Sequence, residues 1–214
     1  MKLLSPFLAK SGRAIEVGCG SARLPCRVGY AAPLSLTAFD SEPAGLQVAK
    51  ATARAFGVKI EPVQGDVRAL PFADDSFDLI LSGGLLEHFE DPMLVLREMV
   101  RMIRPGGTFY ADVVPRQMSL YRHGEARRMQ QSPWLAPSVY EFSFGPSDYA
   151  PWLSELGGQN GRLTSCGVYP NFIGHRLRSG LRRAVSGSLV PLDGGPIAAR
   201  WGWYFAIVGR KRSS

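Results

Sequence analysis

The sequence predicts an α/β fold in which a mostly parallel sheet is covered by helices on both faces. Short apolar runs rich in β-branched or aromatic residues alternate with segments of helical periodicity, a pattern typical of parallel sheets. The composition is that of a globular protein, with 45% apolar and 20% charged residues. Because 214 residues suit one sizeable core, we expect a single domain over residues 1–214.

The first half of the chain carries the clearest alternation. Strands are predicted at residues 14–17, 36–39, 59–63, 77–81 and 108–114. Helices are predicted at residues 22–30, from a Ser41 cap to Gly57, and from Pro92 to the Pro105-Gly106-Gly107 stop, with Ile103 on the apolar face. Since proline cannot donate to a strand ladder, Pro62 indicates that the third strand lies at a sheet edge.

The second half is less regular. Residues 115–146 and 170–199 lack a clear pattern and are predicted to be insertions. Between them, Ser147 could cap a helix over residues 149–156, followed by a sixth strand at 162–169. A seventh strand is predicted at 201–208, where odd-numbered Phe205 and Ile207 would share one face and Ala206 and Val208 the other.

Charge and cysteine content narrow the partners. The net charge is +7, and the excess arginine gathers in the C-terminal half. This basic half is compatible with a small anionic substrate, with nucleic acid, which is not favoured, or with an acidic lipid surface touched by residues 172–183; a solvated face is the plainer alternative. The cysteines, at positions 19, 26 and 166, are an odd number and are expected to be reduced and buried.

Targeting signals are weak in this sequence. No apolar run approaches the roughly 20 residues of a membrane-spanning helix. The apolar start of the chain is broken by Ser5-Pro6 and reaches Lys10, which makes it a poor signal peptide. We therefore expect a cytoplasmic protein.

A glycine turn follows the first predicted strand and opens a helix. Gly18 and Gly20 permit a tight turn and close approach of a ligand to the backbone. A dinucleotide-binding fold would require a third glycine, which Ser21-Ala22-Arg23 does not supply at the right spacing. Glu16, just before the turn, would repel a pyrophosphate but could pair with an ammonium group.

Two further acids end neighbouring strands. Asp40 ends the second strand, twenty residues after Gly20, where a carboxylate can accept hydrogen bonds from both ribose hydroxyls. Asp66 follows the third strand and could accept from an adenine amino group, while a neighbouring backbone N–H donates to the ring. Either residue could instead be an ordinary turn aspartate.

Taken in order, these motifs resemble the Rossmann-like class of S-adenosylmethionine (SAM)-dependent methyltransferases, in the ubiquinone/menaquinone-biosynthesis-like branch. The resemblance covers roughly residues 10–115, and Trp203–Arg210 looks like the last strand of that family. It is carried by Glu16-Val17-Gly18-Cys19-Gly20, Phe39-Asp40, Gly65–Phe72, Ser76–Ile80, Leu86–Pro92, and Leu96-Arg97-Glu98 through Gly107. One departure is Ala22, where members often have glycine.

The resemblance implies a Rossmann-like seven-stranded sheet with an antiparallel last strand, and SAM bound along its carboxyl edge. The implied cofactor-binding residues are Glu16, Gly18, Cys19, Gly20, Asp40, Ser41, Asp66, Val67, Ser82 and Gly83. Within this set, Ser82 and Gly83 would approach the sulfonium end.

Methyl transfer from a sulfonium is an in-line displacement, so the protein mainly aligns the reactants, and no metal is expected. The acceptor would be a small molecule, with aromatic, quinone-like and anionic compounds as candidates. His88, His123 and Tyr121 are weak candidates for a catalytic base, and His88 could equally fix the loop before Pro92. A non-catalytic SAM-binding protein and an NAD-dependent oxidoreductase remain alternatives, with RNA as an alternative substrate.

Overall fold

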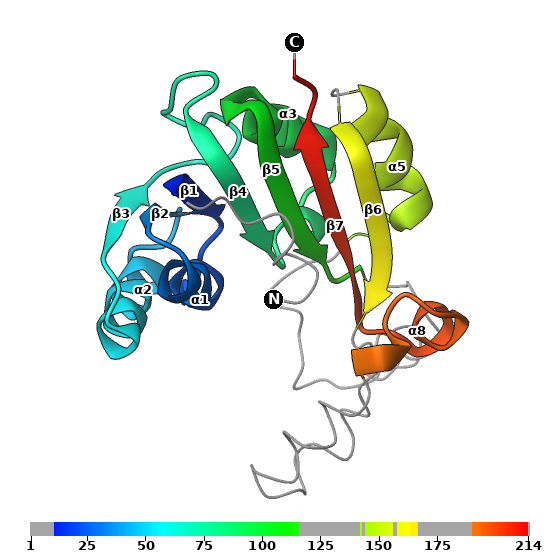
Figure 1. Ribbon diagram of the computed structural model, residues 1–214, viewed down its shortest axis with the longest axis horizontal. Helices are drawn as coiled ribbons and strands as arrows, with labels where there is room; N and C mark the ends of the chain where they lie inside the picture. Colours follow the sequence, from blue (N-terminus) through cyan, green and yellow to red (C-terminus); the bar gives the residue numbers. More distant parts are fainter. Residues whose placement is uncertain (1–10, 116–141, 143, 156–157, 167–189, 214) are drawn as a thin grey trace, which may run out of the picture.

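A computed structural model of the chain describes residues 11–115, 142, 144–155, 158–166 and 190–213 (Figure 1). These residues form one sheet with the strand order β3-β2-β1-β4-β5-β7-β6. The strands are β1 (Gly12–Val17), β2 (Leu34–Asp40), β3 (Ile60–Gln64), β4 (Phe77–Gly83), β5 (Ile103–Val113), β6 (Gly158–Cys166) and β7 (Tyr204–Lys211). The helices are α1 (Arg23–Ala31), α2 (Pro43–Phe56), α3 (Pro92–Met102), α5 (Pro146–Glu155) and α8 (Pro196–Trp201), with short 3₁₀ turns η2 (Leu86–His88) and η3 (Val190–Leu192).

Strand direction confirms the predicted class. Strands β1 to β5 pair in parallel, whereas β7 pairs antiparallel with both β5 and β6. In Figure 1 the arrowheads of β4 and β5 point to one edge of the sheet, and that of β7 points to the other. The fold is therefore α/β, with a mostly parallel sheet and an antiparallel last strand.

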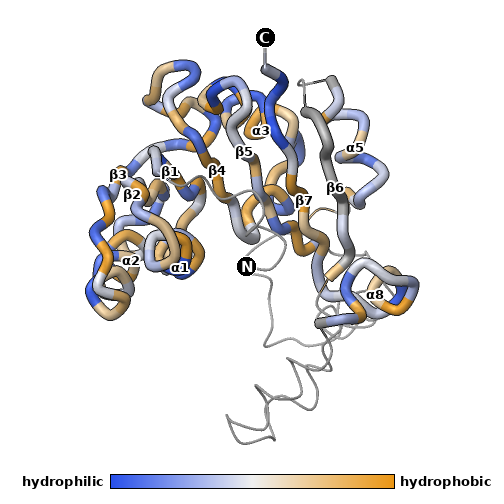
Figure 2. Tube along the Cα trace, viewed as in Figure 1, coloured by the Kyte–Doolittle hydropathy of each residue, from blue (hydrophilic) through white to orange (hydrophobic). Residues whose placement is uncertain are grey.

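Side-chain alternation builds two apolar layers on the sheet. Ile15 and Phe205 belong to a core shared with α3 and α5, which lie behind the strands in Figure 1. Ala14 and Ala206 face the opposite side, where α1 and α2 pack. Figure 2 shows apolar segments along the middle of β4 and β7, with hydrophilic residues toward the C-terminal end of β7. The predicted two faces of the last strand are thus confirmed.

Proline and glycine set several element boundaries as predicted. Pro62 lies in β3, the edge strand, and Gly57 ends α2 with a left-handed φ of 67°. The predicted cap at Ser41 is wrong, because Glu42 occupies the N-cap position and Pro43 begins the helix. The Ser41 carbonyl instead accepts a hydrogen bond from the side-chain amide of Gln64 at 3.1 Å.

Three other predicted boundaries are wrong. Ile103 begins β5 rather than extending α3, and its carbonyl accepts a 2.8 Å hydrogen bond from the Lys211 ammonium of β7. Ser147 lies inside α5, where the Asp148 carboxylate accepts from the Gly145 N–H at 2.7 Å. Trp201 ends α8, so the last strand begins only at Tyr204.

The predicted insertions fall largely outside the described residues. This holds for nearly all of residues 116–143 and for the basic segment 172–183, whose proposed lipid contact stays a prediction. The described end of the second insertion contains η3 and most of α8. In the described ranges, no helix has both the length and the apolarity needed to cross a membrane.

Candidate functional site

The turn between β1 and α1 bends through left-handed backbone. Gly18 has a φ of 69°, Gly20 of 46°, and Ala22 of 51°. The Cys19 N–H donates to the Phe39 carbonyl at 2.9 Å, and the Ala22 N–H donates to the Cys19 carbonyl at 2.7 Å. A left-handed residue with a Cβ costs roughly 1–2 kcal/mol, which explains why glycine suits position 22.

A cavity of about 970 Å³ opens above this turn, along the carboxyl ends of the parallel strands. The structure brings nearly all of the predicted cofactor-binding residues to its wall. They are Glu16, Gly18, Cys19, Gly20, Asp40, Ser41, Asp66, Val67 and Gly83. Ser82 is the exception, because its side chain is fully buried and does not line the cavity.

Asp40 ties the end of β2 to the glycine turn. One carboxylate oxygen accepts from the Gly20 N–H at 2.7 Å, and the other accepts from the Glu42 N–H at 2.9 Å. An ionised carboxylate has about four acceptor positions, so each oxygen retains one after these bonds. Asp40 can therefore still receive two donors from a ligand in the cavity.

Asp66 forms an ion pair with Arg68 at 2.6 Å. Hydrogen bonds from the Arg68 side chain and backbone lower the pKa of Asp66 to about 2. The carboxylate is therefore ionised throughout the neutral range, and it remains half exposed at the cavity wall. The next residue, Val67, is buried in the core and anchors this turn.

Glu16 is the most buried acid of the cavity wall. Its exposed fraction is only 4%, and its Oε2 has no hydrogen-bond partner among the described residues. Burial, followed by the nearby charges of Asp112 and Asp40, raises the pKa of Glu16 well above its ordinary value. A buried acceptor without a donor is costly, so this oxygen is suited to receive a cationic or N–H group of a ligand.

Several cavity residues were missed by sequence reasoning. Helix α1 contributes Arg23, Leu24 and Arg27, and the four-residue spacing of Arg23 and Arg27 could have placed these two on one face. Leu85 and Phe89 supply apolar wall beyond β4. Asp112 also lines the cavity and lies near the end of β5, at the same edge of the sheet. It follows the rule that identified Asp40, namely that ligands bind at the carboxyl ends of parallel strands.

The weak catalytic candidates receive no support from position. His88 ends η2 and does not line the cavity, although the neighbouring Phe89 does. His123 and Tyr121 lie outside the described residues. Phe144, an aromatic residue of the first predicted insertion, packs edge-on against Trp152 with ring centroids 5.5 Å apart.

The cysteines are free and buried, as predicted. Cys19 lines the cavity, but burial and the nearby Glu16 charge raise the pKa of its thiol to about 12. A thiol that stays protonated is a poor nucleophile, so we assign Cys19 a packing role in the turn.

Comparison with known proteins shows what the first half of the chain is similar to. Residues 15–111 match the family model of a methyltransferase domain. A phthiotriol/phenolphthiotriol dimycocerosates methyltransferase of Mycobacterium tuberculosis is 36% identical over 107 residues, which cover 48% of this chain and 38% of that protein. The ubiquinone biosynthesis O-methyltransferase of Methylobacterium sp. is 31% identical over 111 residues, covering 49% of this chain and 41% of the relative.

These matches span only about two-fifths of the length of the curated relatives. The solved structure of a SAM-dependent methyltransferase from Methanosarcina mazei superimposes with a TM-score of 0.69, covering 100% of this chain and 99% of that one. Its sequence identity is 16%, so the likeness concerns the fold.

Proposed function

We propose that this chain, which carries a methyltransferase domain of the SAM-dependent class over residues 15–111, transfers a methyl group from SAM to a small-molecule acceptor. SAM supplies a methyl group activated by a positively charged sulfur. The protein has to hold that group, align the acceptor with the methyl–sulfur bond and exclude water.

The observation that carries the proposal is the sequence of polar groups along the cavity. Asp66 follows β3, Asp40 ends β2, and Glu16 lies near the end of β1, in the order in which these strands neighbour one another. SAM likewise joins an adenine, a ribose and a charged methionine in line. We assign Asp66 and Val67 to the adenine, Asp40 to the ribose, and Glu16 with Gly18 to the methionine.

Two features of the wall support the fit. The unpartnered Glu16 Oε2 is an acceptor suited to the methionine ammonium group. A Cβ built on Gly20 would meet no atom within 4 Å, so the glycine leaves open space at the turn. Both features suit a polar ligand that approaches the backbone closely.

The acceptor class is supported by the relatives and by the wall beyond β4. The two curated relatives are named for a quinone-biosynthesis reaction and for a lipid. Leu85 and Phe89 extend the cavity with apolar surface. We therefore propose an acceptor with an aromatic or otherwise apolar body.

Calorimetry with SAM, S-adenosylhomocysteine and NAD tests the cofactor, and a panel of phenols and quinols tests transfer by release of S-adenosylhomocysteine. We expect both adenosyl compounds to bind, NAD not to bind, and at least one acceptor to be methylated. Binding of NAD in place of SAM would contradict the proposal. Tight SAM binding without transfer to any acceptor would instead favour a non-catalytic SAM-binding protein.

A further inference from the structure

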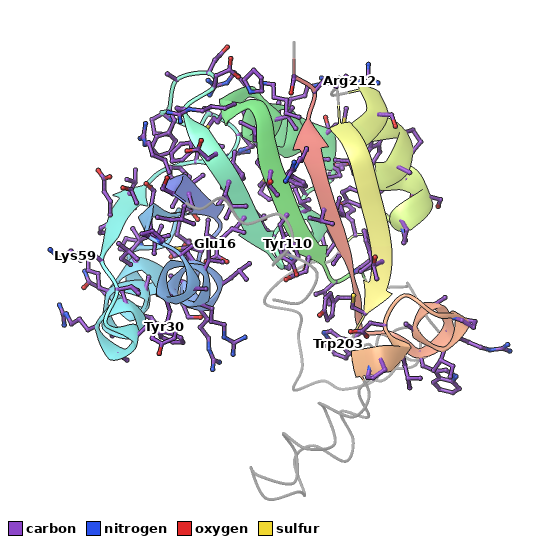
Figure 3. The ribbon with its side chains drawn as sticks, in the orientation of Figure 1. Glu16, Tyr30, Lys59, Tyr110, Trp203 and Arg212 are labelled. Carbon is purple, nitrogen blue, oxygen red and sulfur yellow. The ribbon has the colours of Figure 1, made fainter. Side chains whose placement is uncertain are left out.

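Two carboxylates converge above Gly83 from opposite sides of β4. A Cβ built on Gly83 would lie 3.4 Å from Asp112 Oδ1 and 3.6 Å from Glu16 Oε1. Glu16 comes from β1 and Asp112 from β5, the two strands that flank β4. Figure 3 labels Glu16 and also Tyr110, which lies two residues before Asp112 on the same strand. Any side chain at position 83 would occupy the space that these carboxylates share.

The shared space belongs to the cavity and needs a positive charge. Glu16, Gly83 and Asp112 all line it, and neither acid forms an ion pair with a lysine or arginine of the described residues. Glu16 is nine-tenths or more buried, and its Oε2 has no partner in the same residues. Two desolvated carboxylates at close range repel each other unless a proton or a cation lies between them.

The position of Asp112 along the sheet edge indicates which cation it meets. From β3 to β5, the cavity residues run Asp66, Asp40, Glu16, Gly83 and Asp112. In the proposed orientation the adenine lies at the β3 end and the ribose at β2. Asp112 is therefore the acid farthest from the adenine, on the side where the reactive end of the cofactor must point.

We propose that Asp112 acts with Glu16 to recognise the sulfonium charge of SAM, so that the cavity favours the charged cofactor over S-adenosylhomocysteine, its neutral thioether product. This inference rests on the proposed function. Both molecules carry the same ammonium and carboxylate groups and differ in the positive charge at sulfur. Loss of the sulfur charge on methyl transfer leaves the methionine ammonium as the only positive charge of the ligand beside the two carboxylates, which weakens retention of the product.

Calorimetry on the Asp112→Asn variant tests the pairing, because asparagine keeps the shape and removes the charge. We expect the affinity for SAM to fall at least tenfold and that for S-adenosylhomocysteine to change less than threefold. Asp78→Asn is the matched control, since Asp78 accepts the Arg13 N–H at 2.7 Å and pairs with Arg104 at 3.0 Å, and does not line the cavity. Circular dichroism of each variant checks that it is folded.

Proton release gives a second measurement. Burial raises the pKa of Asp112 to about 6 and that of Glu16 well above its ordinary value. Among the described residues, the other titratable groups around Asp112 are Tyr110, Tyr204 of β7, Cys166 of β6 and Glu87 of η2, all with raised pKa values. At pH 6, binding of SAM in buffers of different ionisation enthalpy should release more protons than binding of S-adenosylhomocysteine, and Asp112→Asn should abolish the difference.

The measurements distinguish SAM binding itself from the role of Asp112 in it. If the unaltered protein binds neither adenosyl compound, the proposed function fails and this inference fails with it. If it binds both but Asp112→Asn weakens them equally, or leaves both unchanged, SAM binding stands and the role of Asp112 in sensing sulfur charge is overturned.

Discussion

The carboxylate of Asp40 accepts the backbone N–H of Gly20 at 2.7 Å, which fixes the end of β2 against the turn that follows β1. The same carboxylate accepts the Glu42 N–H at the start of α2. One side chain therefore shapes two loops of the cavity and also offers oxygens to its interior. Its removal should affect ligand binding and local order together.

Asp40→Ala should weaken SAM binding tenfold or more, since losing a hydrogen bond to a charged group costs about 1.5–3 kcal/mol. Asp40→Asn should cost less, because its one oxygen can keep one of the two backbone donors. Calorimetry on both variants checks the order. If Asp40→Ala and the unaltered protein bound SAM with equal affinity, Asp40 would not be a cofactor-binding residue.

Gly20→Ala should weaken SAM binding while costing no more stability than a matched glycine. Gly57 is that match, because both residues have a left-handed φ (46° and 67°) and an added Cβ would meet no atom within 4 Å at either. Each alanine should destabilise the fold by roughly 1–2 kcal/mol in denaturant unfolding. Only the Gly20 variant should bind SAM less tightly; a similar loss in Gly57→Ala would point to strain instead.

Gly18 is a less direct probe of the cavity than Gly20. A Cβ there would lie 2.7 Å from a terminal methyl of Leu85, so Gly18→Val would displace Leu85 as well as narrow the turn. We still expect loss of SAM binding in that variant. That loss would reflect changes both in the glycine turn and in the apolar wall at Leu85.

Arg101→Lys should lower the free energy of unfolding by about 1–3 kcal/mol. The Arg101 guanidinium, 29% exposed, pairs with Glu98 and Asp74 and donates to the carbonyls of Phe72 and Leu70. Lysine cannot reproduce this planar fork. Arg54→Lys is the control, because Arg54 also lies in the last turn of its helix but is exposed; it should change stability by less than about 0.5 kcal/mol.

Glu87→Gln should become more stable, relative to the unaltered protein, as the pH rises from 5 to 8. Burial raises the pKa of Glu87 to about 7, above its unfolded value, so its contribution to stability is present at low pH and is lost as the pH rises through about 7. Glutamine stays neutral and should gain on the order of 1–3 kcal/mol over that range.

Denaturant unfolding at several pH values measures this difference. Glu90→Gln, three residues along and exposed, is the matched control for the loss of one carboxylate. Parallel curves for Glu87→Gln and Glu90→Gln would mean that Glu87 titrates normally in the folded protein.

The part of the site nearest β1 and β2 was predictable because its signals are local. Gly18 and Gly20 form a turn within one short segment, and Asp40 ends the very next strand. Ser82 was misplaced because successive residues of a strand face opposite sides. Gly83 lies on the side of Glu16, whereas Ser82 points into buried surroundings.

The pairing of Asp112 with Glu16 could not be predicted in the same way, because it depends on which strands become neighbours. In the sequence Asp112 is one acid in an apolar run, 96 residues after Glu16. Only the insertion of β4 between β1 and β5 brings the two carboxylates to one glycine. The prediction that Ile103 belongs to the helix beginning at Pro92 was wrong for a related reason. The Ile103 carbonyl accepts a hydrogen bond from Lys211, which is over a hundred residues away in the chain.

The interior place of β7 governs the order in which this sheet can assemble. Strand β6 precedes β7 in the chain but touches the rest of the sheet only through it. During synthesis on the ribosome, β6 must wait for residues 204–211 to emerge before it can dock. Such a long-range pairing is a slow closing step, so the half of the molecule that contains the glycine turn can be built well before its far edge.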